Sequence, residues 1–135
     1  MVTYSFSTSL SPRYRDIDAN GHVNHAVYAT YMEEARTHYW QHVVGGCLSD
    51  AGVAIVSLEI DYHSELSLGD HVAIEMGVGQ LGESSIPQYY RLSTEDTVAA
   101  LGQAVMVAFD RDSRTSRPIP SDWKEAIREH ERASV

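Results

Sequence analysis

Hydrophobic and polar residues alternate in five segments of the chain, with the period of two that is typical of half-buried β-strands. These segments cover approximately residues 3–8, 56–62, 72–78, 86–92 and 101–109. Short polar links at Ser67–Asp70, Gly82–Ser85 and Thr94–Asp96 separate the last four segments, and such links join neighbouring antiparallel strands. The sequence therefore predicts a first strand followed later by a four-stranded meander.

In the last strand, the alternating set that we expect to face the core contains one irregular step. Its members are Leu101, Gln103, Val105, Val107 and Phe109.

Between the first and second strands the hydrophobic spacing changes to three and four residues, which is typical of an α-helix with one buried face. The residues that recur at this spacing are Val27, Tyr28, Tyr31, Met32, Ala35 and Tyr39. Asn24 is a suitable N-cap and Gly45–Gly46 a suitable stop, which predicts a helix over about residues 25–43. A second, shorter helix is predicted over 122–132, with Ser121 as its N-cap.

One long apolar helix and about five strands bury both apolar faces only if the sheet curls around the helix. We therefore expect an α+β fold, in which a curled antiparallel sheet surrounds a central helix and a short C-terminal helix follows. A chain of 135 residues is of the size of one ordinary domain, so residues 1–135 are predicted to form a single domain.

Composition narrows the functional classes. Hydrophobic residues make up 43% of the chain and charged residues 21%, and we expect a protein with neither a bilayer-crossing segment nor a secretory signal. The net charge of −9 argues against nucleic acid and anionic membranes as partners, since both require a basic surface. Cys47 is the single cysteine, which excludes an intrachain disulfide and favours a cytoplasmic location.

The chemically richest part of the sequence is the polar segment directly before the long helix. It contains two carboxylates, two imidazoles and two amides: Asp16, Asp18, Asn20, His22, Asn24 and His25. An acid with histidine and asparagine beside a helix N-terminus can activate water and stabilise an oxyanion. Acyl transfer to water requires this combination.

The run from Asp16 to Tyr28 resembles the D-x-D-x-x-G-x-V-x-x-x-x-Y signature of the hotdog-fold acyl thioesterases of the 4-hydroxybenzoyl-CoA thioesterase type. Further similarity lies in Met32–Arg36, in Ile60–His63 with Leu68–Asp70, and in Arg117–Pro120, so that about residues 4–125 are covered. The resemblance implies a hotdog fold, an acyl-CoA substrate and a site between two subunits of a homodimer or homotetramer.

The resemblance also implies residue roles. The acid that matches Asp18 attacks the thioester carbonyl or activates the water that does so. At the position of His25 a backbone N–H points at the carbonyl oxygen, and in some members a histidine side chain there assists catalysis. The spacing of Asp18, Asn20 and His22 is also similar to the D-x-N-x-H element of plant acyl-carrier-protein thioesterases, which makes His22 a second candidate. Asn20 is then a substrate-binding candidate.

Several of these residues have structural alternatives. Asp16 is interpreted as a turn cap, because two active carboxylates so close together would repel each other. His22 is either a catalytic partner or a loop histidine bonded to the backbone. Asn24 is either a helix cap that aligns the oxyanion donors or a catalytic contact. Tyr28 belongs either to the core or to the lining of an acyl tunnel.

Arg111 and Arg114, together with Arg117, follow the last predicted strand. They are either ligands of the coenzyme A phosphates or part of a solvated loop.

His38 and His42 share a helix face, but no third ligand is evident, and the resemblance implies hydrolysis without a metal or any other cofactor. The expected function is hydrolysis of an acyl-CoA to the free acid and coenzyme A. A hotdog hydratase or dehydratase acting on acyl thioesters is one alternative, and a non-catalytic acyl-thioester binding protein is another. The acyl group, and the choice between coenzyme A and acyl-carrier protein, stay open.

Overall fold

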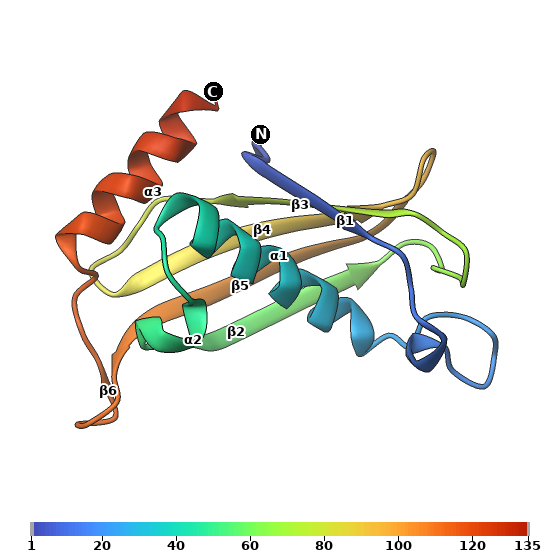
Figure 1. The fold of residues 1–135 in the computed structure, drawn as a ribbon, viewed down its shortest axis with the longest axis horizontal. Coiled ribbons are helices and arrows are strands. Elements are labelled where there is room, and N and C mark those ends of the chain that lie inside the picture. Colours follow the sequence, from blue (N-terminus) through green and yellow to red (C-terminus); the bar gives the residue numbers. More distant parts are fainter. Residues whose placement is uncertain (1, 135) are drawn as a thin grey trace.

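The computed structural model describes residues 2–134 and contains one curled sheet with a long helix across one of its faces (Figure 1). The strands are β1 (Phe6–Leu10), β2 (Val53–Tyr62), β3 (Val72–Val78), β4 (Ser85–Ser93), β5 (Val98–Asp110) and β6 (Thr115–Ser116). The helices are the 3-10 turn η1 (Tyr14–Asp16), α1 (Val27–Val43), α2 (Leu48–Ala51) and α3 (Ser121–Ala133). The predicted combination of a curled sheet, a long helix and a C-terminal helix is confirmed, whereas η1, α2 and β6 were not predicted.

The strand order is β1-β3-β4-β5-β2, with antiparallel pairing throughout and the short β6 beside β5. Strands β3, β4 and β5 form the predicted meander, but β2 is not part of it. The chain leaves β2 at one edge of the sheet and enters β3 near the opposite edge, so the expectation that Ser67–Asp70 joins neighbouring strands is wrong. Alternation identifies a strand but does not specify its neighbour.

Helix α1 packs closely against β5 because the inward face of this strand carries small residues. Ala100, Gly102 and Ala104 are buried, and a Cβ at Gly102 would lie 2.6 Å from Met32 Cε. The larger residues Leu101 and Val105 are on the other face, so the predicted inward set 101–109 of β5 is wrong. Close helix–sheet contact required the small side chains on the inside.

Strands β3 and β4 follow their predicted pattern. Val72, Ile74 and Met76 are buried along β3, and Ile86 and Leu92 along β4. Strand β1 begins at Phe6 and ends at Leu10, two or three residues later than predicted at each end. Within the described part of the chain, no helix is long and apolar enough to cross a membrane.

Helix α1 begins at Val27, two residues later than predicted. The side chain of Asn24 does not cap the helix itself, because its Oδ1 accepts the N–H of Ala26 (3.0 Å) in the turn that precedes the helix. The predicted stop is confirmed by Gly45, which has a φ of +100°. Helix α3 includes Ser121 as its first residue, and Pro120 takes the N-cap position instead.

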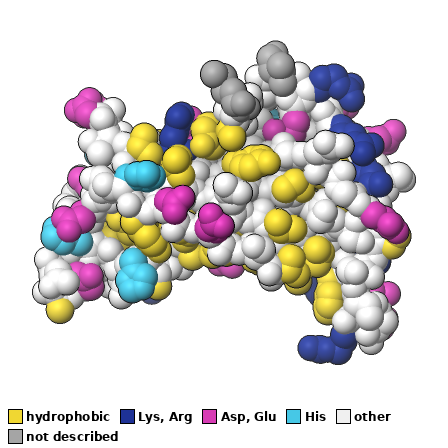
Figure 2. Space-filling model, turned by 180° about the vertical axis from the view of Figure 1, so that it is seen from behind, with side chains coloured by type: hydrophobic (Ala, Val, Ile, Leu, Met, Phe, Trp, Pro, Cys, Tyr) yellow, Lys and Arg dark blue, Asp and Glu magenta, His cyan; other side chains and the backbone are white. Residues whose placement is uncertain are grey.

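The edge strand β2 is the least covered part of the sheet. Val56 is 61% exposed and Leu58 is 44% exposed, although both are hydrophobic. On the face of the sheet opposite α1, hydrophobic side chains gather in patches separated by polar ones (Figure 2). One copy of the chain therefore leaves apolar surface uncovered along this edge.

Candidate active site

The loop that carries Asp18 has a defined conformation. Asp18 Oδ1 accepts the N–H groups of Asn20 (2.9 Å) and His22 (3.3 Å), and the N–H of Asp18 donates to the carbonyl oxygen of His22 (2.8 Å). The loop is also joined to the segment before β3, since the N–H of Val23 donates to the carbonyl oxygen of Leu66 (2.8 Å). These bonds orient the carboxylate and leave its Oδ2 without a hydrogen bond to residues 2–134.

The half-buried carboxylate of Asp18 lies at a cavity of about 490 Å³ between this loop, the start of α1 and the end of β2. The cavity is lined by Asp18, Asn20, His22, Val23, His25, Tyr28, Tyr62, His63, Ser64 and Glu65. Five of the predicted site residues, Asp18, Asn20, His22, His25 and Tyr28, are therefore brought together.

His25 lies in the turn directly before α1. Its backbone N–H makes no hydrogen bond to any residue within 2–134, and the helix begins two residues later. Free N–H groups and the helix dipole both attract negative charge at such a position. The arrangement therefore offers a donor to an oxyanion that forms in the cavity.

His22 forms an ion pair that the sequence did not indicate. Its Nε2 lies 3.0 Å from Oε2 of Glu65, and both residues line the same cavity. A carboxylate in this position can accept a hydrogen bond from Nε2 and so fix the orientation of the ring. Glu65 is the residue of the site that sequence reasoning missed.

Two tyrosines form the aromatic wall of the cavity. Tyr28 is buried, its hydroxyl donates to the carbonyl oxygen of Ser64 (3.2 Å), and it accepts the N–H of Leu66 (3.2 Å). The ring of Tyr62 packs edge-on against Tyr28 at a centroid distance of 5.0 Å and is 48% exposed. Burial raises the pKa of both hydroxyls above the ordinary value of 10.0, so both stay protonated near neutral pH.

Three predicted site residues do not line this cavity. The side chain of Asn24 is engaged with the N–H of Ala26. Arg111 and Arg114 lie beyond the far end of β5, in the turn before β6, whereas the Asp18 loop is at the opposite end of the molecule (Figure 1). Arg111 donates there to the carbonyl oxygen of Ser49. Within one chain, both arginines therefore lie away from the Asp18 cavity.

Asp16 has the structural role expected for it. Its Oδ2 accepts the N–H of Arg13 (2.9 Å) and the hydroxyl of Tyr31 (2.7 Å). Burial, followed by the bond to Asp16, raises the pKa of Tyr31. The Asp16 carboxylate therefore holds the 3-10 turn against α1.

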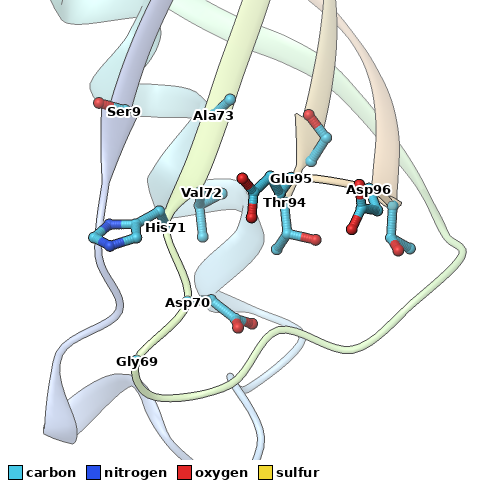
Figure 3. A pocket seen from close by; sticks show the side chains of 11 residues that line it. Ser9, Gly69, Asp70, His71, Val72, Ala73, Thr94, Glu95 and Asp96 are labelled. Atoms are coloured by element: carbon cyan, nitrogen blue, oxygen red, sulfur yellow. The ribbon is translucent and has the colours of Figure 1, made fainter.

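A larger hollow of about 760 Å³ lies among the start of β3, the β4–β5 turn and β1 (Figure 3). Its lining includes the acids Asp70, Glu95 and Asp96, but Asp70 is engaged by the N–H of Ser67 (2.8 Å).

Residues 2–134 contain no group of three or more His, Cys, Asp or Glu side chains that could hold a metal ion. The Asp18 cavity has the acid, the histidine pair and the oxyanion donor together, and we therefore assign the candidate active site to it.

Residues 12–127 match the model of the thioesterase-like superfamily. This match covers most of the chain, so the protein belongs to that superfamily and to its class of thioester hydrolases. The predicted family resemblance is thereby confirmed.

The chain is also similar to proteins that are named as thioesterases or acyl-CoA hydrolases. A 1,4-dihydroxy-2-naphthoyl-CoA hydrolase from Synechococcus elongatus is 28% identical, over 91% of this chain and 96% of the relative. A thioesterase from Thermus thermophilus, solved in complex with coenzyme A and Zn, superposes with a TM-score of 0.88 and 31% identity over 97% of each chain. A predicted thioesterase from Bacillus stearothermophilus gives a TM-score of 0.85 at 27% identity, over 93% of this chain and 95% of the other. The fold is therefore the hotdog fold, as expected.

Proposed function

We propose that the protein hydrolyses an acyl-CoA thioester to the free acid and coenzyme A, with Asp18 as the acidic catalytic residue. The observation that carries this proposal is the position of two groups at one cavity: the Asp18 carboxylate, with a free Oδ2, and the unbonded N–H of His25. A thioester carbonyl bound between them meets an attacking oxygen on one side and a hydrogen-bond donor on the other.

In the general-base form of the reaction, Asp18 takes a proton from water while the water oxygen bonds to the carbonyl carbon. The carbonyl oxygen becomes an oxyanion that accepts the His25 N–H. Collapse of this intermediate breaks the carbon–sulfur bond and releases the thiolate. In the nucleophilic form, Asp18 itself attacks the carbonyl, and water then cleaves the resulting anhydride.

The leaving thiolate requires a proton, and His22 is the candidate donor. Glu65, 3.0 Å from its Nε2, orients the ring for this transfer. The proton taken up by Asp18 then returns to the imidazole, so that the net reaction consumes one water and releases one acid and one thiol. No cofactor is required, because coenzyme A is part of the substrate.

Asn20 and the ring of Tyr62 are the candidate contacts of the acyl group, since both line the cavity. The exposed Tyr62 ring, with His25 edge-on at a centroid distance of 6.2 Å, offers a flat surface to a planar acyl group. The 1,4-dihydroxy-2-naphthoyl-CoA hydrolase among the relatives acts on such a planar acyl group, as its name states. Aromatic acyl-CoAs are therefore the first substrates to test.

A second copy of the chain would complete the site. The edge strand β2 has unpaired backbone groups and the exposed residues Val56 and Leu58, which pairing with another β2 would cover. Antiparallel pairing about a twofold axis brings the first residues of one β2 beside the last residues of the other. Arg111 lies near the first residues of β2, with Arg114 in the same turn, and both would then approach the partner's cavity, where coenzyme A phosphates need cations.

The proposal is tested by following thiol release from a panel of aromatic and aliphatic acyl-CoAs. Steady turnover that Asp18→Asn abolishes supports hydrolysis. Hydration of an enoyl-CoA without thiol release would instead support the hydratase alternative. Tight binding of an acyl-CoA without any turnover would support the binding-protein alternative, and either of these results overturns the proposal.

A further inference from the structure

The hydroxyl of Tyr62 donates a hydrogen bond of 2.8 Å to the backbone carbonyl oxygen of His25. This bond joins the last residue of β2 to the turn that carries the candidate oxyanion donor, across a sequence separation of 37 residues.

The two peptide groups on either side of His25 have four polar backbone atoms, and three of them are hydrogen-bonded. The carbonyl oxygen of Asn24 accepts the N–H of Val27 (2.9 Å), and the N–H of Ala26 donates to Asn24 Oδ1 (3.0 Å). The carbonyl oxygen of His25 accepts the Tyr62 hydroxyl. The fourth group, the N–H of His25, has no hydrogen bond to residues 2–134, and His25 lines the cavity.

The other two bonds are local to residues 24–27 and would move with the turn as a unit. The Tyr62 bond differs because it ties the turn to the sheet. The Tyr62 ring is itself held edge-on against the buried Tyr28, at a centroid distance of 5.0 Å. The start of the turn is also held to the loop, because the N–H of Asn24 donates to the carbonyl oxygen of Asp16 (2.8 Å). Loss of the Tyr62 hydroxyl would therefore loosen the peptide groups around His25, beyond this bond, without removing the ring from the cavity wall.

We propose that Tyr62 is a positioning residue for catalysis, which acts through its hydroxyl on the carbonyl of His25 and so aims the His25 N–H at the oxyanion. This inference rests on the proposed thioester hydrolysis and names a residue that acts on that same site. An oxyanion-hole donor is worth about 10²–10³-fold in kcat in other enzymes, and its effect depends on alignment. A donor that is present but loosely held should retain part of this effect.

The test is Tyr62→Phe, which removes the hydroxyl and keeps the ring. Tyr14→Phe is the matched control, because Tyr14 is 84% exposed and lies outside the cavity. We expect kcat to fall by about 10-fold or more in Tyr62→Phe with KM nearly unchanged, since the affected interaction forms only in the transition state. Tyr14→Phe should match the wild type in both constants, and sedimentation should give the same oligomeric state for all three proteins.

A second measurement separates positioning from a general loss of structure. A trifluoromethyl ketone analogue of acyl-CoA forms a tetrahedral adduct, whereas a thioether analogue resembles the ground state. Tyr62→Phe should weaken binding of the ketone by about the factor lost in kcat and leave binding of the thioether unchanged. Equal weakening of both analogues, or unchanged kcat and ketone binding, would overturn the inference while leaving hydrolysis established.

A third measurement does not depend on turnover. Amide hydrogen exchange at residues 24–27 of the free protein should be faster in Tyr62→Phe than in the wild type and in Tyr14→Phe. Unchanged exchange would show that Tyr62 does not hold this turn. If the wild type releases no thiol from any acyl-CoA, the proposed function fails. The exchange measurement still decides whether the Tyr62 hydroxyl holds the turn at residues 24–27.

Discussion

The carboxylates of Asp16 and Asp18 line different cavities, although a single residue separates them in the chain. Asp16 faces a cavity of about 280 Å³ beside Tyr31, whereas Asp18 lines the cavity of about 490 Å³ beside His22. Asp16 Oδ2 accepts the Tyr31 hydroxyl at 2.7 Å, while Asp18 Oδ2 has no hydrogen bond to the described residues. One acid is therefore engaged in structure and the other is available for chemistry, so substitutions at the two positions should have opposite consequences.

Asp18→Asn should abolish most turnover while the protein stays folded. The amide oxygen can still accept the N–H groups of Asn20 and His22, so the loop keeps its conformation. The amide can neither take a proton from water nor attack the carbonyl, and general acid–base groups contribute about 10²–10⁴-fold. Thiol release under saturating acyl-CoA measures the loss. Wild-type turnover in a folded Asp18→Asn protein would contradict the catalytic assignment.

Asp16→Ala should lower stability and retain most of the turnover. It leaves the hydroxyl of Tyr31, which is only 4% exposed, without its acceptor. An unsatisfied buried group of this kind costs about 1–3 kcal/mol, which urea unfolding detects. Tyr31→Phe is the matched partner: if the hydroxyl is the cause, Asp16→Ala should cost less in the Tyr31→Phe background than in the wild type. Equal costs in both backgrounds would rule out this coupling.

Glu65→Gln should lower kcat through its effect on His22. The amide keeps the size of the side chain but removes the carboxylate that pairs with His22 Nε2 at 3.0 Å. We expect a decrease of about 3- to 30-fold, because the His22 ring is then less firmly oriented for proton transfer. The exposed Glu95, which lines the other hollow, gives the control Glu95→Gln. A folded Glu65→Gln protein with the kcat of the wild type would show that the pair has no catalytic role.

Leu58→Glu should prevent association of two chains. Leu58 is 44% exposed on the edge strand, and a charge there would be buried without a partner if β2 pairs with a second β2. Sedimentation should give a larger complex for the wild type and a single chain for Leu58→Glu, with reduced turnover. Val98→Glu is the control, because Val98 is 40% exposed in β5 and pairs with β4 rather than with the free edge. A wild-type protein that sediments as a single chain would contradict the proposed assembly.

The parts of the fold that follow from local pattern were predictable from the sequence. The inward residues of β3 and β4 alternate with polar ones, and the long helix has a clear three-to-four spacing, so both were identified. The inward face of β5 was misread, because Ala100, Gly102 and Ala104 are less hydrophobic than their outward neighbours. Their small size is required by the approach of Met32, and this requirement exists only once the helix is packed on the sheet.

The candidate active site also has residues that the sequence predicts and residues that it does not. Asp18, His22 and His25 lie within one short segment, so their proximity could be read directly from the chain. Glu65 could not be found in this way, because it reaches the cavity only through the position of β2 at the far edge of the sheet. Strand neighbours depend on packing of the whole domain, and no local spacing in the sequence encodes them.

The buried tyrosines should not change stability with pH below about pH 10 and should lower it above that pH. Burial raises the pKa of Tyr39 and of Tyr90 above the ordinary value of 10.0, and for Tyr39 the hydrogen bond to Glu131 raises it further. Above pH 10 the unfolded chain loses these protons while the folded chain keeps them, so folding becomes less favourable by about 1.4 kcal/mol per pH unit for each such tyrosine. Urea unfolding between pH 8 and 11 measures this slope. Tyr39→Phe should make the slope smaller by the contribution of one tyrosine. A slope that is the same in Tyr39→Phe and in the wild type would contradict the raised pKa of Tyr39.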